Sequence, residues 1–313
     1  TNVTHAGILR TQNLTATPIT ASKIWGGTVT FDGGSAQIIP ASNFNNLTLS
    51  NSTGASLGGA INVGGNLTLT SGILTTGANL LAVTNTSGSA VTGYSASSYV
   101  NGPLQWTLLN GNSYLFPVGD ATNYRPFELN NTVCSSPVIR VTMASTGAST
   151  VDATLSSVAA RNWYAQLIGG TFTSATVRLT ESGLTSSNAV ASATAAQAGP
   201  YTNQGGNSIA GGTITSNAAI SYTGSTYFAI GTVPPAVVLS NNGTQVTAGN
   251  VVGGTTNVLL HQSALAVTIV NATLTGMTCT TAGSYFSADI TNLKAWYQTT
   301  STFNAGTATL LST

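Results

Sequence analysis

The sequence predicts an all-β protein, with a solenoid-like region of short strands at the amino end followed by a β-sandwich and an immunoglobulin-like domain. Short runs in which apolar and polar residues alternate are separated by glycine pairs, which is typical of strands and tight turns. No segment keeps a helical period for longer than about two turns. Thr, Ser, Asn, Gly and Ala dominate the composition around these apolar runs, as expected of a secreted β-rich structural protein.

The charge content argues against most kinds of function. Only seven Lys and Arg and six Asp and Glu occur in 313 residues, whereas about a quarter of the residues of a typical globular domain are charged. Nucleic-acid binding needs a basic surface, acid–base catalysis needs positioned carboxylates or histidines, and hard-metal sites need clustered acids. We therefore expect no enzyme activity, no cofactor, no metal site and no nucleic-acid partner.

The hydropathy predicts folded domains rather than disorder. The apolar fraction is 42%, the mean hydropathy is +0.23 and the net charge is +1, whereas disordered chains combine low hydropathy with high net charge. No apolar run is long enough to predict a membrane span. Near-zero net charge leaves little repulsion between copies, which suits a polymer subunit. The start at Thr1 fits an exported chain that has lost its signal peptide.

The amino-terminal third carries a weak repeat. Residues 46–49, Asn-Leu-Thr-Leu, return as residues 66–69 with leucines on one face and threonines on the other, and fainter echoes occur at 13–15 and 79–81. Glycine pairs between such strands are typical of solenoid turns. We predict a strand segment over 1–20, without a local partner, and a solenoid-like domain over 21–96.

Residues 97–232 are richer in aromatic side chains and predict a β-sandwich. The runs 104–109 and 113–118 flank an Asn-Gly turn and predict a hairpin. Residues 183–200, rich in Ala, Ser and Thr, predict a surface loop. The strands expected after the hairpin are 138–143, 163–168, 171–180 and 227–230.

Residues 233–313 begin with Val233-Pro234-Pro235, a stiff linker that cannot donate ladder hydrogen bonds from its prolines. The alternating runs after it predict an immunoglobulin-like sandwich, and we expect this domain to be incomplete. The predicted strands are 237–240, 245–248, 257–261, 264–270 and 294–298.

Residues 27–37, 44–49 and 63–69 resemble the repeated stalk module of long, multi-domain extracellular proteins of the Bacteroidetes that the type IX secretion system exports. Residues 99–104, 116–120 and 124–126 resemble the domain that commonly follows it, and residues 289–297 are similar to a further sandwich domain. The resemblance implies an extracellular or cell-surface location and a structural role, with no catalytic residues to carry over.

Two motifs invite a catalytic or ligand-binding interpretation. Residues 54–58 match the Gly-x-Ser-x-Gly nucleophile elbow, but short strands flank them and the nearest histidine downstream is His261, so a glycine-rich turn is favoured. Asp120, Arg125 and Glu128 form the densest charge cluster. They could hold a ligand or glycan, but we favour a turn capped by Asp120 and an ion pair of Arg125 with Glu128 or another carboxylate.

Other residue types have an ordinary structural interpretation that we favour over a functional one. The four tryptophans could line a carbohydrate groove but suit core packing, and threonine alternation suits a half-exposed strand better than an ice-binding array. The two cysteines are expected to be free rather than paired. Neither histidine has another Cys or His residue at the spacing typical of a zinc site. These residues are Trp25, Trp106, Trp163 and Trp296, Cys134 and Cys279, and His5 and His261.

The function predicted from the sequence is a structural subunit of an extracellular filament or surface fibre. Strand addition between copies would join the segment 1–20 of one copy to residues 236–313 of another, head to tail. Two alternatives remain, a surface adhesin or stalk that binds a glycan and an accessory region of an enzyme. The residues expected at the assembly contact are Ile8, Leu9 and Leu14 on the donor side and Val238 and Leu310 on the acceptor side.

Overall fold

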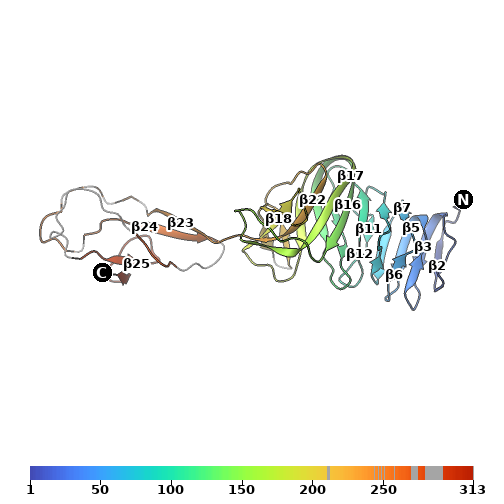
Figure 1. Ribbon diagram of the computed structural model, residues 1–313, viewed down its shortest axis with the longest axis horizontal. Helices are drawn as coiled ribbons and strands as arrows, with labels where there is room; N and C mark the ends of the chain where they lie inside the picture. Colours follow the sequence, from blue (N-terminus) through green and yellow to red (C-terminus); the bar gives the residue numbers. More distant parts are fainter. Residues whose placement is uncertain are drawn as a thin grey trace. The chain divides into compact units, whose positions relative to one another are not determined.

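The computed structural model describes residues 1–209, 212–242, 244–245, 247, 249, 251–256, 258–268, 274–278 and 292–312. Every regular element within these ranges is a β-strand, and none is a helix (Figure 1). The chain divides into two compact units, Thr1–Pro234 and Pro235–Thr313. The prediction of an all-β fold is therefore confirmed for the described part of the chain.

Residues 2–119 form a β-solenoid of about six turns, in which each turn adds strands to stacked parallel columns. In Figure 1 the strands β2, β3, β5, β7 and β11 follow one another along this part of the unit. The first column contains β1 (Asn2–Val3), the start of β3 (Ile24–Phe31), the start of β5 (Ser42–Ser50), β7 (Ile61–Val63), β10 (Leu81–Val83) and β13 (Leu104–Thr107).

Two further columns complete each turn. The second contains β2 (Ile8–Thr11), the ends of β3 and β5, β8 (Leu67–Ser71) and β11 (Val91–Thr92). The third contains β4 (Gln37–Ile39), β6 (Ala55–Leu57), β9 (Leu74–Thr75), β12 (Val100–Asn101) and β15 (Val118–Gly119). The solenoid thus extends beyond both boundaries predicted for it, at 21 and at 96.

The predicted repeat at 46–49 and 66–69 is confirmed as a structural register. Leu47 lies beside Leu67 and Leu49 beside Leu69, and all four side chains are buried. Parallel stacking places like residues above one another, so that each turn buries a face it could not bury alone. The echo at 79–81 belongs to another column, because Leu81 pairs with Ile61.

The prediction of an unpartnered strand segment over 1–20 is wrong. β2 pairs in parallel with β3, where Leu9 lies beside Val29, and β1 pairs with the start of the same strand. The echo at 13–15 is not a strand either, because the side-chain oxygen of Asn13 accepts a hydrogen bond from the backbone N–H of Thr15 at 2.9 Å. Such a local turn competes with ladder pairing.

Buried amides fix the corner between the second and third columns. The Asn51 side-chain nitrogen donates to Gln37 Oε1 at 3.0 Å, and the Gln37 nitrogen donates to the backbone oxygen of Thr11 at 2.9 Å. Both amides are buried, so these bonds tie successive turns together where water is excluded. Close by, Gly72 has a φ of +84°, and a Cβ there would collide with the backbone oxygen of Asn51.

Antiparallel strands follow the last solenoid turn. The 18-residue strand β16 (Phe127–Ala144) pairs with β13 and with β14 (Tyr114–Phe116), and the 24-residue strand β17 (Ser157–Thr180) pairs along β16. β16 thereby covers the end of the parallel stack. The remaining strands are β18 (Asn188–Ala193), β19 (Thr202–Asn203), β20 (Asn207–Ile209), β21 (Thr213–Thr215) and β22 (Ser225–Thr232).

Two local predictions in this region are wrong. β13 and β14 do not form a hairpin with each other, because the Asn-Gly turn is a solenoid corner and the two strands pair with different parts of β16. The region 183–200 is not all loop, since β18 lies within it and pairs with β22. The predicted strands 138–143, 163–168, 171–180 and 227–230 are confirmed within β16, β17 and β22.

One hydrophobic core runs through the solenoid into the antiparallel region. Trp106 contacts Phe116 with ring centroids 5.6 Å apart, Phe116 contacts Phe127 at 6.3 Å, and Phe127 contacts Phe228 at 5.3 Å. The predicted boundary between 96 and 97 therefore lies inside a single packed unit.

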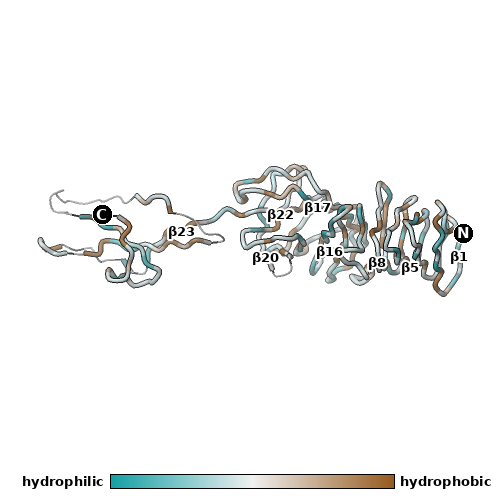
Figure 2. The backbone as a smooth tube through the Cα atoms, turned by 90° about the horizontal axis from the view of Figure 1, so that it is seen from below, coloured by the Kyte–Doolittle hydropathy of each residue, from teal (hydrophilic) through white to brown (hydrophobic). Residues whose placement is uncertain are grey.

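The second unit has two hairpins in its described part. β23 (Ala236–Asn241) pairs with β24 (Ser263–Thr268), and β25 (Ala295–Tyr297) pairs with β26 (Thr309–Ser312). The predicted strands 245–248 and 257–261 are not strands where the structure describes them. No described residue of this unit is buried. Figure 2 nevertheless shows hydrophobic residues, in brown, along β23.

Candidate functional site

The first turn of the solenoid exposes an unpaired, partly apolar strand edge. Within the described pairings, β1 and β2 pair only with β3, so the outer edge of β2 has no partner strand. Leu9 is partly buried against the core, whereas Ile8 is 69% exposed. Leu14 is also exposed, but it lies in the turn after β2 rather than in a strand.

The hairpins of the second unit expose apolar side chains on strand edges that have no partner among the described residues. Val238 of β23 is 52% exposed and Leu310 of β26 is 43% exposed. β23 pairs only with β24 in the part of the unit that is described. Four of the five predicted assembly residues thus lie on strands that have one side without a partner among the described residues, and the fifth, Leu14, does not.

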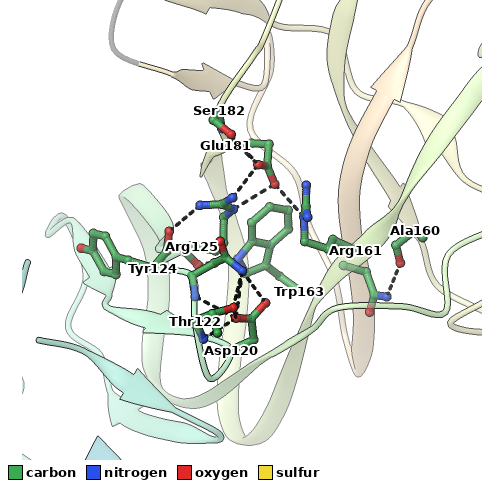
Figure 3. A network of polar contacts seen from close by, with 11 residues as sticks. Asp120, Thr122, Tyr124, Arg125, Ala160, Arg161, Trp163, Glu181 and Ser182 are labelled. Carbon is green, nitrogen blue, oxygen red and sulfur yellow. Dashed lines mark hydrogen bonds and ion pairs between the residues drawn. The ribbon is translucent and has the colours of Figure 1, made fainter. Parts of the chain in front are cut away.

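The cluster around Asp120 is a network that closes the end of the third column (Figure 3). Asp120 Oδ1 accepts hydrogen bonds from the backbone N–H groups of Thr122 and Asn123, both at 2.8 Å. Burial alone would raise the pKa of this carboxyl, but these hydrogen bonds outweigh it and hold the pKa below its ordinary value. The prediction that Asp120 caps a turn is confirmed.

Arg125 forms its ion pair with Glu181 rather than with Glu128. Arg125 Nη2 lies 2.9 Å from Glu181 Oε1, and Arg161 Nε lies 2.8 Å from Glu181 Oε2 (Figure 3). Glu128 pairs with Arg178 instead. Sequence analysis allowed for another carboxylate but did not identify Glu181, because the partners are 56 residues apart in the chain. Both carboxylates are thus paired with arginine guanidinium groups, and these ion pairs hold neighbouring strands together.

The Gly-x-Ser-x-Gly match does not have the geometry of a nucleophile elbow. Ala55–Leu57 form β6, which lies between β4 and β9 in the third column rather than ahead of a helix. Gly54 adopts a φ of +82° and makes the turn before this strand. The interpretation as a glycine turn is correct for Gly54, while residues 55–57 are strand.

The described residues contain neither a cluster of metal ligands nor a helix that could span a membrane. No group of three or more His, Cys, Asp and Glu side chains gathers there. That part of the chain also holds no helix with the length and hydropathy needed to cross a membrane. His5 packs edge-on against Trp25, with ring centroids 6.0 Å apart, and His261 shares a hydrogen bond with Ser263.

Three of the four tryptophans are core residues, as predicted. Trp25, Trp106 and Trp163 are buried. Trp296 is half-buried, with its ring centroid 6.3 Å from that of Phe303. Cys134 has a free thiol and packs at the margin of the core, where burial raises its pKa. Cys279 lies outside the described residues.

Threonines stack in register along the second column, but only in single file. Thr30, Thr48, Thr68 and Thr92 are neighbours on successive turns. The adjacent outward position carries Thr28 on one turn and Asn46 on the next. The array is therefore one residue wide, which favours the interpretation of ordinary half-exposed strands over an ice-binding surface.

No family model, no curated protein and no solved structure matches the chain.

Proposed function

We propose that this chain is a structural subunit of an extracellular filament or surface fibre, joined by β-strand addition between copies. The single observation that carries the proposal is the presence, among the described residues, of two strand edges that have no partner, one in each unit. The solenoid of unit 1 presents the open edge of β2, and unit 2 presents β23, whose Val237, Val238 and Leu239 are all at least half exposed. Unpaired edges of this kind readily accept another strand.

The two ends of the solenoid differ in a way that supports an acceptor role for β2. At the last turn, β13 is covered by the antiparallel strand β16. At the first turn, Val3 and Leu9 are only partly buried at the margin of the core. Terminal repeats of solenoids normally need a cap, and a strand added beside β2 would supply one.

β23 has the composition of a donor strand. Moving an apolar side chain such as Val or Leu from water into a packed interface stabilises by about 1.5–3 kcal/mol, and backbone hydrogen bonds along the strand add to this. The low charge of the chain means that few ions would be desolvated on contact. The donor is thus in unit 2 and the acceptor in unit 1, the reverse of the roles expected from the sequence.

Contact between the second unit of one copy and the first unit of the next is head-to-tail. Such a contact does not close on itself unless its rotation happens to form a ring, so repetition generates a filament. In this proposal residues 97–232 include a β-sandwich, unit 2 is an immunoglobulin-like sandwich completed by its neighbour, and the fibre lies outside the cell. The resemblance of the chain to exported Bacteroidetes surface proteins supports that location.

Negative-stain electron microscopy of Val238→Lys tests the proposal. A lysine in β23 would have to be buried in the strand-addition contact, so we expect monomers where the unaltered protein forms fibres. Val252→Lys is the matched control, because Val252 is exposed outside any strand, and it should form normal fibres. Fibres of normal length from Val238→Lys, or no fibres from the unaltered chain at any concentration, would contradict the proposal.

A further inference from the structure

The outward face of the antiparallel sheet in unit 1 holds a shallow groove of about 440 Å³. Its floor comes from β16, β17 and β22, and its wall includes Gln197. Along these strands, groove residues alternate with core residues. On β17, for example, Tyr164 and Gln166 line the groove, while Trp163 and Ala165 are buried on the opposite face.

Strand register arranges the side chains of this face in two rows. One row contains the groove residues Arg140 and Gln166, and Gln105 on β13 is the next neighbour of Arg140 in that row. The other row runs from Thr142 through Tyr164 to Tyr227. A band of amides and a guanidinium therefore lies directly beside a band of aromatic rings.

Ring stacking and hydrogen bonds hold the aromatic row in place. The rings of Tyr164 and Tyr227 are stacked, with centroids 4.4 Å apart and planes 13° from parallel. The Tyr164 hydroxyl donates to Ser225 Oγ at 2.9 Å and accepts from Gln166 Nε2 at 2.9 Å. Both rings remain partly exposed, although Tyr227 also packs against the cluster that contains Ala193 and Tyr201. A partly exposed aromatic ring suits the C–H face of a pyranose ring.

Arg140 differs from the other arginines described in unit 1. Arg10, Arg125, Arg161 and Arg178 each pair with a carboxylate. Arg140 instead donates to an uncharged acceptor, Gln105 Oε1, from Nε at 3.3 Å and from Nη2 at 2.9 Å. Neither Asp nor Glu lines the groove. A guanidinium has five N–H donors in a planar fork that fits an oxyanion, so Arg140 retains donors for one.

We propose that this groove binds an anionic saccharide. A sugar ring would lie against the Tyr164 and Tyr227 pair, and its carboxylate or sulfate would be held by Arg140. The amides of Gln166 and Gln197 would meet its hydroxyls. A nucleic acid would need several cations, whereas this groove has one. A peptide added as a strand would need a free edge, whereas β17 is paired on both sides, with β16 and β22.

Isothermal titration calorimetry of the full chain tests this site with three probes: tetragalacturonate, a sulfated galactotetraose and neutral galactotetraose. We expect tetragalacturonate or the sulfated sugar to bind at least tenfold more tightly than the neutral one, and their ranking distinguishes carboxylate from sulfate recognition. Arg140→Gln should remove this preference while leaving the neutral sugar unchanged, because a glutamine keeps the hydrogen bonding but not the charge. Tyr227→Ala should weaken all three.

Arg10→Gln is the matched control, since it removes the same charge from an exposed pair on the solenoid, and it should bind as the unaltered protein does. Circular dichroism verifies that each variant is folded. Absence of binding by both anionic sugars overturns the proposal, as does unchanged affinity in folded Arg140→Gln. The groove is made by residues of unit 1, whereas Val238 belongs to unit 2, so Val238→Lys should bind these sugars normally. Failure of filament assembly and failure of sugar binding can therefore be distinguished.

Discussion

The two units contain strands of similar composition but differ in what those strands bury. Leu47 of β5 has 0% exposure, whereas Leu239 of β23 has 63%. β5 has parallel neighbours on both sides, while β23 has one described partner. A short apolar sequence is therefore enough to make a strand, but stacking of further strands on both sides is what makes a core.

Matched leucine substitutions would test this comparison and should give the largest difference. Leu47→Ala removes a fully buried side chain from the solenoid and should lower the free energy of unfolding by about 2–5 kcal/mol. Leu239→Ala should change the stability of the monomer by no more than about 0.5 kcal/mol. Urea denaturation followed by circular dichroism measures both, at a concentration below that of fibre formation. Equal losses would mean that the contrast between the units is not one of burial.

Alanine substitutions at two separate glycines, Gly72 and Gly34, test how tightly the solenoid corners are packed. Gly72→Ala puts a Cβ at a φ of +84° and against the backbone of Asn51, so we expect a loss of about 1–3 kcal/mol or more. Gly34 has open space around the position of a Cβ, and Gly34→Ala should be nearly neutral. Thermal unfolding of both variants provides the measurement. A Gly72→Ala protein as stable as the unaltered chain would show that the corner relaxes easily.

Substitutions at Glu181 and at Arg10 compare a mostly buried ion-pair network with an exposed ion pair, both inside unit 1. Glu181→Gln leaves Arg125 and Arg161 without their carboxylate and should cost about 2 kcal/mol. Arg10→Gln breaks a pair in which the arginine is largely exposed and should cost no more than about 0.5 kcal/mol. Both values come from urea denaturation. The prediction fails if the two variants lose the same stability.

The pH dependence of stability should be the smallest effect. The pKa of Asp120 lies below its ordinary value of 3.8, so its contribution is complete above that pH and is lost only as the pH falls through the lowered pKa. Burial raises the pKa values of Tyr99, Tyr124 and Tyr222 above 10.0, so their contribution is lost only above about pH 10. Melting temperatures should therefore change little between about pH 5 and pH 9. A steep transition inside that window would contradict this.

The fold could be predicted from sequence where adjacent turns share the same residues. The turns at 46–49 and 66–69 repeat Asn-Leu-Thr-Leu, and their leucines stack as expected. The first turn could not be recognised from the sequence. Ile8-Leu9-Arg10-Thr11 pairs in parallel with Thr28-Val29-Thr30-Phe31, but the residue types of the two strands differ, so no repeat is visible. β18 escaped because its small residues are buried on both faces, so that no alternation appears.

The candidate sites were less predictable than the fold. Open edges depend on which strands lack neighbours, and this property belongs to the topology rather than to any residue. The groove residues Arg140, Tyr164 and Tyr227 come from three strands that only antiparallel register brings together. The Arg125 partner Glu181 is likewise distant in sequence. In each case the signal is a juxtaposition across strands, which a single sequence does not display.

Hydrogen exchange of the protein in fibres and as a monomer tests strand addition between β23 and β2. We expect the backbone amides of Val237–Leu239 and of Ile8–Thr11 to exchange at least tenfold more slowly in the fibre, because each strand gains a partner. The inner strand β5, already paired on both sides, should be unchanged. Fibres in which both of these edges exchange as fast as in the monomer would contradict the account.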